Sequence, residues 1–163
     1  MTTAGTSTEP SSAGTESRAG SERIIVGVDG SRESETALAW AARYAHATGG
    51  RLVAILAWHY PSAAGGPPVG VAPEAVTSEV EKSRYDMLDK AIEATCGKMP
   101  PADVERKVVY GHPAQALLDE SRNADLLVVG SKGYGGFTGM MLGSVSTHCV
   151  THATCPVTVV KHS

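Results

Sequence analysis

The strongest constraint on the fold is a regular alternation between short, β-branched apolar runs and segments with helical periodicity. Residues 24–28 are apolar on both faces, which is typical of a central strand buried from both sides. Residues 126–129 repeat this pattern near the other end of the chain. Because helical segments separate these runs, the sequence predicts a parallel sheet with crossover helices on both faces.

The expected elements follow from this periodicity and from the residues that punctuate it. Ser31 is expected to cap the first helix, which Gly49-Gly50 should end. The strands are expected at residues 24–28, 52–58, 104–110, 126–129 and 157–160, and further helices from the Pro- and Gly-rich loop 61–73 to Cys96-Gly97, at 113–122 and at 144–153. The prediction is one α/β domain with a five-stranded parallel sheet.

Length and composition divide the chain into a tail and one domain. With 163 residues and 42% hydrophobic content, the chain can bury one core but has no room for a second full domain. Residues 1–22 consist almost wholly of small and polar residues, so we expect a disordered tail that acts as a solubilising leader rather than a regulatory segment. The domain is expected over residues 23–163.

Charge and cysteine usage exclude several classes of partner. The net charge is -3, which leaves no broad basic surface for a nucleic-acid backbone or an anionic membrane. The sequence shows neither a membrane-spanning run nor an apolar secretory segment, so a cytoplasmic protein is expected. Cys96, Cys149 and Cys155 lack metal-type CxxC spacing, which favours reduced thiols over a disulfide framework or zinc site.

The segment with the clearest chemistry is residues 130–145, which joins a buried strand to the last helix. Its repeated glycines allow positive φ and close approach of a ligand, and the free N–H groups at residues 143–145 attract an anion. A phosphate-binding loop is therefore favoured over a merely flexible one. A Walker motif and a G-x-G-x-x-G after the first strand are both missing, which excludes a Walker-type NTPase and argues against NAD.

Gly130, Gly133, Gly143 and Ser144 fill the pattern G-x2-G-x9-G-[ST], and in this the chain resembles the ATP-binding subgroup of the universal stress protein family. The resemblance extends over residues 23–162, including the opening Ile-Val-Gly-Val-Asp-Gly-Ser and the closing Cys-Pro-Val-Thr-Val-Val. It implies a Rossmann-like, adenine nucleotide α-hydrolase-like fold. It also implies a nucleotide-dependent switch in the stress response, with ATP as the ligand.

The same resemblance implies roles for individual residues. Asp29 and Gly130 would contact the ribose, and the backbone of Ala57 would meet the adenine edge. The phosphates, with Mg²⁺ bound through them, would lie at Gly133, Gly143 and Ser144, with Ser131 and Val145 as neighbours. The resemblance further implies a homodimer that pairs residues 157–160 across a two-fold axis.

Several alternatives stay open from the sequence alone. The same loop could hold the single phosphate of cyclic AMP, or Ser144 or loop threonines could accept phosphate in a slow ATPase or autophosphorylating enzyme. No general base is marked, so no catalytic residue is assigned. Asp29 could serve only an Asx turn, and Lys132 could be a solvated loop residue. His148 and His152 lack a third ligand, so no metal site is expected.

The remaining alternatives are an ATP-pyrophosphate-type ligase of the same broader nucleotide-binding superfamily and a response-regulator receiver, which shares the alternating architecture. The ligases carry S-G-G-x-D-S after the first strand, where this chain has residues 28–31, Val-Asp-Gly-Ser. The receiver needs a phosphoacceptor arrangement that residues 130–131 do not provide. Both readings rank far below nucleotide binding.

Overall fold

The computed structural model describes residues 21–59, 73–97, 104–134, 139 and 141–162, with the side chains of 73–77 left aside. The predicted disordered tail, apart from its last two residues, lies outside this described part of the chain. The same holds for residues 61–72 of the loop that was expected before the second helix.

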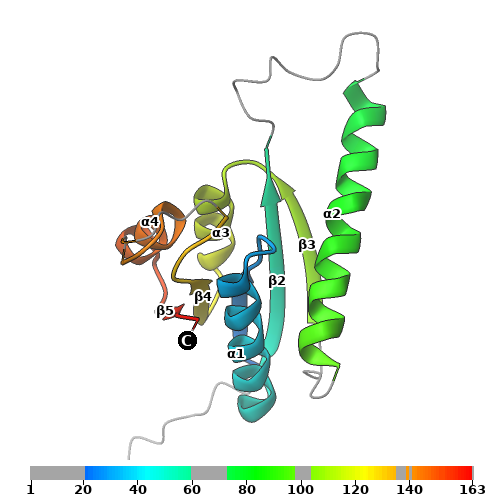
Figure 1. The fold of residues 1–163 in the computed structure, drawn as a ribbon. Helices are drawn as coiled ribbons and strands as arrows, with labels where there is room; N and C mark the ends of the chain where they lie inside the picture. The colour runs from blue at the N-terminus through cyan, green and yellow to red at the C-terminus, as the bar shows by residue number, and fades with distance from the viewer. Residues whose placement is uncertain (1–20, 60–72, 98–103, 135–138, 140, 163) are drawn as a thin grey trace, which may run out of the picture.

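Nine elements alternate along the described chain (Figure 1). The strands are β1 (Arg23–Gly27), β2 (Arg51–Trp58), β3 (Val104–Tyr110), β4 (Leu126–Gly130) and β5 (Val157–Val160). The helices are α1 (Arg32–Thr48), α2 (Pro73–Cys96), α3 (Pro113–Ser121) and α4 (Ser144–His152). All strand pairs are parallel, in the order β3-β2-β1-β4-β5, which confirms the predicted fold class.

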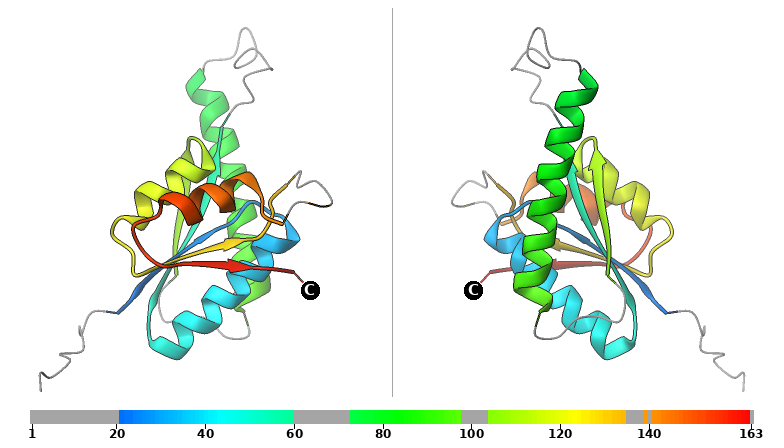
Figure 2. Two further views of the ribbon diagram at one scale, coloured as in Figure 1. Left: turned by 90° about the vertical axis from the view of Figure 1, so that its left-hand side faces the viewer. Right: turned by 90° about the vertical axis from the view of Figure 1, so that its right-hand side faces the viewer.

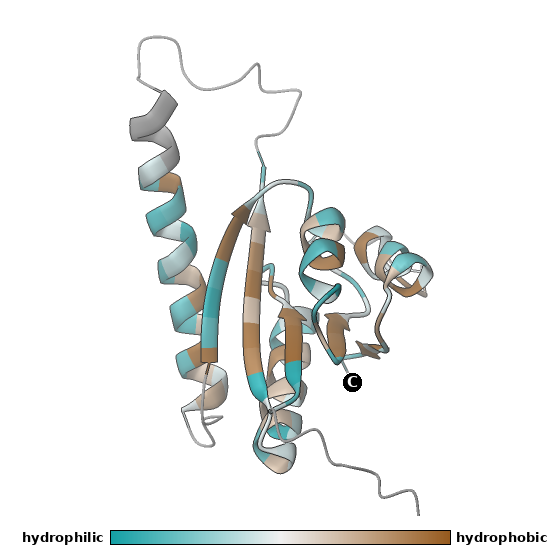
Figure 3. Cartoon of the chain, turned by 180° about the vertical axis from the view of Figure 1, so that it is seen from behind, coloured by the Kyte–Doolittle hydropathy of each residue, from teal (hydrophilic) through white to brown (hydrophobic). Residues whose placement is uncertain are grey.

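The sheet is covered on both faces, as the apolar strands require. Helices α1 and α2 lie on one face and α3 and α4 on the other (Figure 2). The central strands are apolar on both sides, with Ile24, Ile25 and Val26 fully buried in β1. The edge strand β3 is apolar at its ends and hydrophilic in its middle (Figure 3), where Glu105, Arg106 and Lys107 follow one another.

Strand order reverses beside β1, and this positions the site. From β1 the chain passes through α1 to β2 and then through α2 to β3, both on one side of β1. It then returns through α3 to β4 on the other side. Ligands of open parallel sheets bind outside the carboxyl ends of the strands at such a reversal. In this chain the reversal lies between β1, which ends at Gly27, and β4, which ends at Gly130.

The caps expected for α1 are confirmed. The Ser31 side chain accepts a hydrogen bond from the Ser34 N–H at 3.2 Å, and Gly49 takes the left-handed conformation with φ 68° after the last helical turn. Because Ser31 directly follows Asp29-Gly30, the first turn of α1 is fixed close to the end of β1. The turn that leaves β1 therefore forms one wall of the crevice.

Candidate functional site

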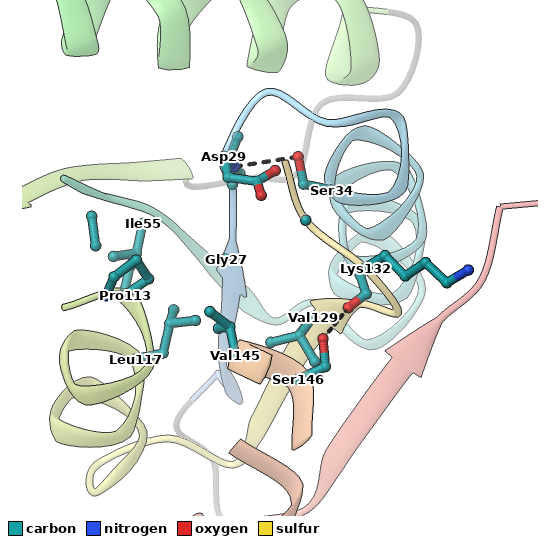
Figure 4. Close-up of a pocket in the computed structure, with 14 residues that line it drawn as sticks. Gly27, Asp29, Ser34, Ile55, Pro113, Leu117, Val129, Lys132, Val145 and Ser146 are labelled. Atoms are coloured by element: carbon teal, nitrogen blue, oxygen red, sulfur yellow. Dashed lines mark hydrogen bonds between the residues drawn. The ribbon is translucent and has the colours of Figure 1, made fainter. Parts of the chain in front are cut away.

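A pocket occupies the crevice at the carboxyl ends of the strands (Figure 4). Its empty space, open mouth included, is about 540 Å³. Residues from β1, β2, β4, α1, α3 and α4 and from the turns after the strands meet there. They are Gly27, Val28, Asp29, Ser34, Ile55, Ala57, Pro113, Leu117, Val129, Gly130, Lys132, Gly133, Val145 and Ser146.

One end of the pocket is an apolar slot. Ile55 from β2, Leu117 from α3 and Val129 from β4 line it, together with Pro113 and Val145 at the starts of α3 and α4. In Figure 4 Pro113 and Leu117 lie on one side of β1 and Val129 lies on the other. Such a slot suits a flat apolar ring, whose polar edge can reach the backbone of the neighbouring Ala57.

Asp29 stands at the polar side of the pocket, where it joins the β1 turn to the glycine-rich loop. Its Oδ1 accepts the Ser31 N–H at 2.9 Å and the Ser31 hydroxyl at 2.5 Å. Its Oδ2 accepts the Tyr134 N–H at 3.1 Å. The Asx turn considered from the sequence is therefore present. Asp29 nonetheless lines the pocket and remains exposed, so a ligand can reach its carboxylate.

The two ends of the glycine-rich loop are held together where β4 ends and α4 begins. The Gly143 N–H donates to the Ser131 carbonyl at 2.7 Å, and the buried Ser146 hydroxyl donates to the Gly130 carbonyl at 2.5 Å. A Cβ on Gly143 would lie only 3.6 Å from the Gly133 nitrogen. Glycines that are ten residues apart in the sequence pattern thus meet at one place in the fold.

The glycines of this loop allow other parts of the protein to pack closely against it, and few of them are needed for an unusual backbone angle. Among the described residues of the loop, only Gly139 has positive φ, at 113°. A Cβ on Gly130 would lie 2.8 Å from the backbone carbon of Glu33, so α1 could not pack against the end of β4. A Cβ on Gly133 would overlap Asp29 Oδ2. Gly130 therefore requires glycine for lack of space, whereas a Cβ at Gly133 would push the Asp29 carboxylate out of its present position.

The start of α4 leaves its N–H groups free of competing negative charge. Its N-cap is Gly143, which has no side chain to accept from them, and the first turn contains no acidic residue. Helix α1 is the opposite case, with the Ser31 cap and with Glu33 and Glu35 in its first turn. The positive end of a helix dipole therefore faces the site at α4.

The structure brings most of the predicted site residues together. Those that line the pocket are Asp29, Ala57, Gly130, Gly133 and Val145. The others, Ser131, Gly143 and Ser144, flank it at the junction between β4 and α4. Ser131 is only 5% exposed, and its N–H donates to the Val160 carbonyl at 2.7 Å.

Sequence reasoning missed the contribution of α3, from which Pro113 and Leu117 line the pocket. The available signal was the chain order, because a helix that starts directly after the carboxyl end of β3 places its first turns at the ligand edge. Lys132, which the sequence left unassigned, also lines the pocket. Its side chain points away from Pro113 and Leu117 in Figure 4.

Other candidate chemistry is weaker in the described part of the chain. The His148 and His152 rings stack face to face, with their centroids 4.4 Å apart. Among the described residues, no group of three or more metal-ligating side chains is found. None of the described helices is long and apolar enough to cross a membrane.

The three cysteines are free thiols with little tendency to ionise. Cys149 is fully buried, and burial, with a smaller effect of Cys155, raises the pKa of its thiol to about 11. Burial also raises the pKa of the Cys96 and Cys155 thiols. A thiolate nucleophile is therefore disfavoured at all three positions.

Comparison with known proteins gives the family. A universal stress protein of Mycolicibacterium smegmatis is 39% identical over 138 residues, which are 85% of this chain and 45% of that protein, so the chain spans about half the length of such relatives. A universal stress protein solved in complex with cyclic AMP is 28% identical, with a TM-score of 0.60 over 85% of this chain and 95% of that one. The Archaeoglobus fulgidus universal stress protein, solved in complex with dAMP, is 20% identical, with a TM-score of 0.52 over 86% and 98%. The family model for universal stress proteins matches residues 20–161, and this chain therefore belongs to the universal stress protein family.

Proposed function

We propose that the pocket binds ATP and that its occupancy switches the shape or the partners of the protein. The observation that carries this proposal is the combination of two features in one crevice. An apolar slot lined by Ile55, Leu117 and Val129 suits adenine, and a glycine-rich loop leads from it to the uncapped start of α4. Asp29 lies between the two, where the ribose would be.

Two features support phosphate binding at the start of α4, namely the room left by missing side chains and the free N–H groups of the helix. Gly133 and Gly143 face each other without side chains, so the phosphates can approach the backbone closely. The free N–H groups at Ser144 and Val145 would donate to the phosphate oxygens. Mg²⁺ would be held mainly by the phosphates, since the described residues offer no cluster of carboxylates for it.

Cyclic AMP is the second candidate. The relative solved with cyclic AMP shares 28% of its residues with this chain, and the A. fulgidus protein was solved with dAMP. Both ligands carry adenine and a single phosphate, which the apolar slot and the start of α4 could hold in the same way. Adenine recognition is thus common to both candidates, and the number of phosphates distinguishes them.

We further propose that binding rather than turnover is the function of this site. The described residues that line the pocket include one carboxylate, Asp29, and its oxygens already accept three hydrogen bonds. A general base would have to reach a water or hydroxyl beside the terminal phosphate. Slow hydrolysis or phosphate transfer to Ser144 remains the enzymatic alternative, and it predicts ADP as a product.

A homodimer through β5 completes the proposal. This strand is the last in the sheet order, and all four of its residues are partly buried. The other edge, β3, carries a run of three charged residues that discourages pairing. A second copy that pairs along β5 would remove the one apolar edge of the described sheet.

Calorimetric titration tests the nucleotide proposal. ATP, ADP, AMP and cyclic AMP are titrated into the wild type and into Gly143→Ala, with and without Mg²⁺. The added Cβ lies 3.4 Å from the Lys132 Cα, so the fold should tolerate it, whereas the phosphates lose their closest approach. We expect ATP affinity to fall at least about tenfold in this variant and AMP affinity to change little.

The matched control is Ser144→Ala, which removes one hydroxyl and keeps every backbone N–H group. It should weaken ATP binding less than Gly143→Ala does. Tighter binding of cyclic AMP than of ATP would favour the second candidate. If no adenine nucleotide binds to the wild type, the proposed function is wrong.

A further inference from the structure

Asp29 has nearly exhausted its capacity to accept hydrogen bonds before any ligand arrives. A carboxylate offers about four lone-pair positions, two on each oxygen. Within the part of the chain that the structure describes, Ser31 fills both positions on Oδ1, through its N–H and its hydroxyl. Tyr134 fills one position on Oδ2 through its N–H. One position, on Oδ2, is therefore left for a ribose hydroxyl.

A ligand could displace some of the three hydrogen bonds to Asp29 more easily than others. Ser31 is 9% exposed, and its hydroxyl oxygen also accepts the Ser34 N–H as the cap of α1. Disturbing it would leave helical N–H groups without a partner. The bond from Tyr134 is exposed to solvent, so water can satisfy its N–H at once. A ligand that needs a second position on Asp29 will take it from Tyr134.

We propose that Asp29 distinguishes nucleotides by their free ribose hydroxyls. A nucleotide with a free 2′,3′-diol displaces the Tyr134 N–H from Oδ2, whereas a nucleotide with a single free hydroxyl leaves that bond in place. ATP belongs to the first class. Cyclic AMP belongs to the second, because its 3′ oxygen is esterified to the phosphate. This inference rests on the proposed adenine-nucleotide site.

The displaced bond is one that holds the glycine-rich loop to the end of β1. The Tyr134 ring lies over the β1 turn, since a Cβ on Gly30 would be 3.7 Å from its Cε2 and 3.4 Å from Met87 Sδ. The Tyr134 residue is 82% exposed. When its N–H is released from Asp29, Tyr134 can change its position, and this exposed aromatic side chain lies beside α2. The protein surface around Tyr134 would therefore differ between the ATP-bound and the cyclic AMP-bound protein.

The Tyr134 amide proton, followed by heteronuclear NMR, reports the bond directly. The protein is saturated in turn with ATP, 3′-deoxy-ATP and cyclic AMP, and Asp29→Ala without ligand marks the signal of the released state. We expect ATP to move the Tyr134 signal toward that position and to speed its exchange with water about tenfold. The Gly50 amide, which donates to the Ala45 carbonyl at the end of α1 far from the pocket, is the internal reference.

3′-Deoxy-ATP is the decisive ligand, because it keeps the three phosphates and lacks one hydroxyl. It should bind and leave the Tyr134 signal in place. Ser31→Gly is the matched variant: it keeps the backbone N–H and frees one position on Oδ1. ATP should then bind without releasing Tyr134. If this variant does not fold, the ligand series in the wild type decides alone.

The outcomes separate this inference from the proposed function. ATP that binds by calorimetry but leaves the Tyr134 signal unmoved overturns the inference and leaves the nucleotide site standing. Equal release by ATP and 3′-deoxy-ATP overturns it as well. Failure of all three nucleotides to bind overturns the proposed function itself.

Discussion

At the scale of single residues, glycine is required at the site more by lack of space for a side chain than by the need for an unusual backbone angle. Gly130 is required because the backbone of Glu33 lies where its Cβ would be, and this contact joins α1 to the end of β4. The sequence marked Gly130 as a ligand-binding glycine through its place in the family pattern. The packing reason was invisible there, because nothing in the sequence shows which turn of α1 approaches β4.

Gly130→Ala should therefore destabilise the fold whether or not a nucleotide is present. A Cβ placed 2.8 Å from the Glu33 carbonyl carbon meets backbone, which cannot swing aside. We expect a loss of about 1–3 kcal/mol in the free energy of unfolding, measured by urea denaturation. Gly143→Ala, with its nearest neighbour at 3.4 Å, is the control and should lose much less. Equal losses in the two variants would contradict this account.

The cysteines give a second prediction at this scale. Burial raises the pKa of the Cys149 thiol to about 11, so the fraction of thiolate at neutral or mildly basic pH is very small. A disulfide reagent such as DTNB should react slowly with the folded protein and rapidly with all three thiols after unfolding in guanidinium. Fast labelling of folded Cys149 would show that it is not buried.

At the scale of elements, periodicity and punctuation were sufficient for most of the fold. The predicted strand 104–110 and the Ser31 cap agree with the structure. The third and fourth helices end one residue earlier than expected, at Ser121 and His152. Such helix ends depend on cap geometry, which apolar spacing does not encode.

The pattern of residues limits the possible orders of the strands in the sheet, but it does not determine a single order. The alternation of strands and helices requires parallel pairs, and β-branched runs mark the buried strands. Which strand lies at an edge follows from packing between distant segments. The charged middle of β3 is consistent with its edge position, whereas the short apolar β5 gives no such indication.

The edge position of β5 leads to a prediction on assembly. The Pro156 carbonyl accepts from the Leu127 N–H of β4, and the Val160 carbonyl accepts from the Ser131 N–H just after β4. The alternation along a strand therefore turns the backbone groups of Val157 and Val159 toward the open edge. Val159→Pro removes an outward N–H, and we expect monomers by light scattering. Val159→Ala keeps that N–H and should still form the proposed dimer. Dimers of the proline variant would place the interface elsewhere.

At the scale of the whole molecule, one charged group ties helix α3 to two strands of the sheet. Glu120 on α3 pairs with Arg23 of β1 at 3.1 Å and with Lys107 of β3. Burial acts to raise the pKa of the Glu120 carboxyl, but hydrogen bonds and charge from Lys107 and Arg23 outweigh it and lower the pKa. This cluster fixes α3, which carries Leu117 into the pocket.

The lowered pKa of Glu120 predicts how stability depends on pH. The ionised carboxylate stabilises the fold above the ordinary value of 4.5, and this stabilisation is lost as the pH falls through the lower folded value. Urea denaturation should show the wild type more stable than Glu120→Gln near neutral pH. The two should converge in acid. A constant difference across this range would rule out the ionic contribution.

The most direct test of the central claim is a heteronuclear NMR titration of the wild-type protein with ATP, which follows every assigned amide at once. We expect the largest shifts at Ala57, Gly133 and residues 143–146, around the pocket and the start of α4. Saturable binding with the largest shifts elsewhere, such as the open groove at Arg32, Thr36 and His162, would contradict it.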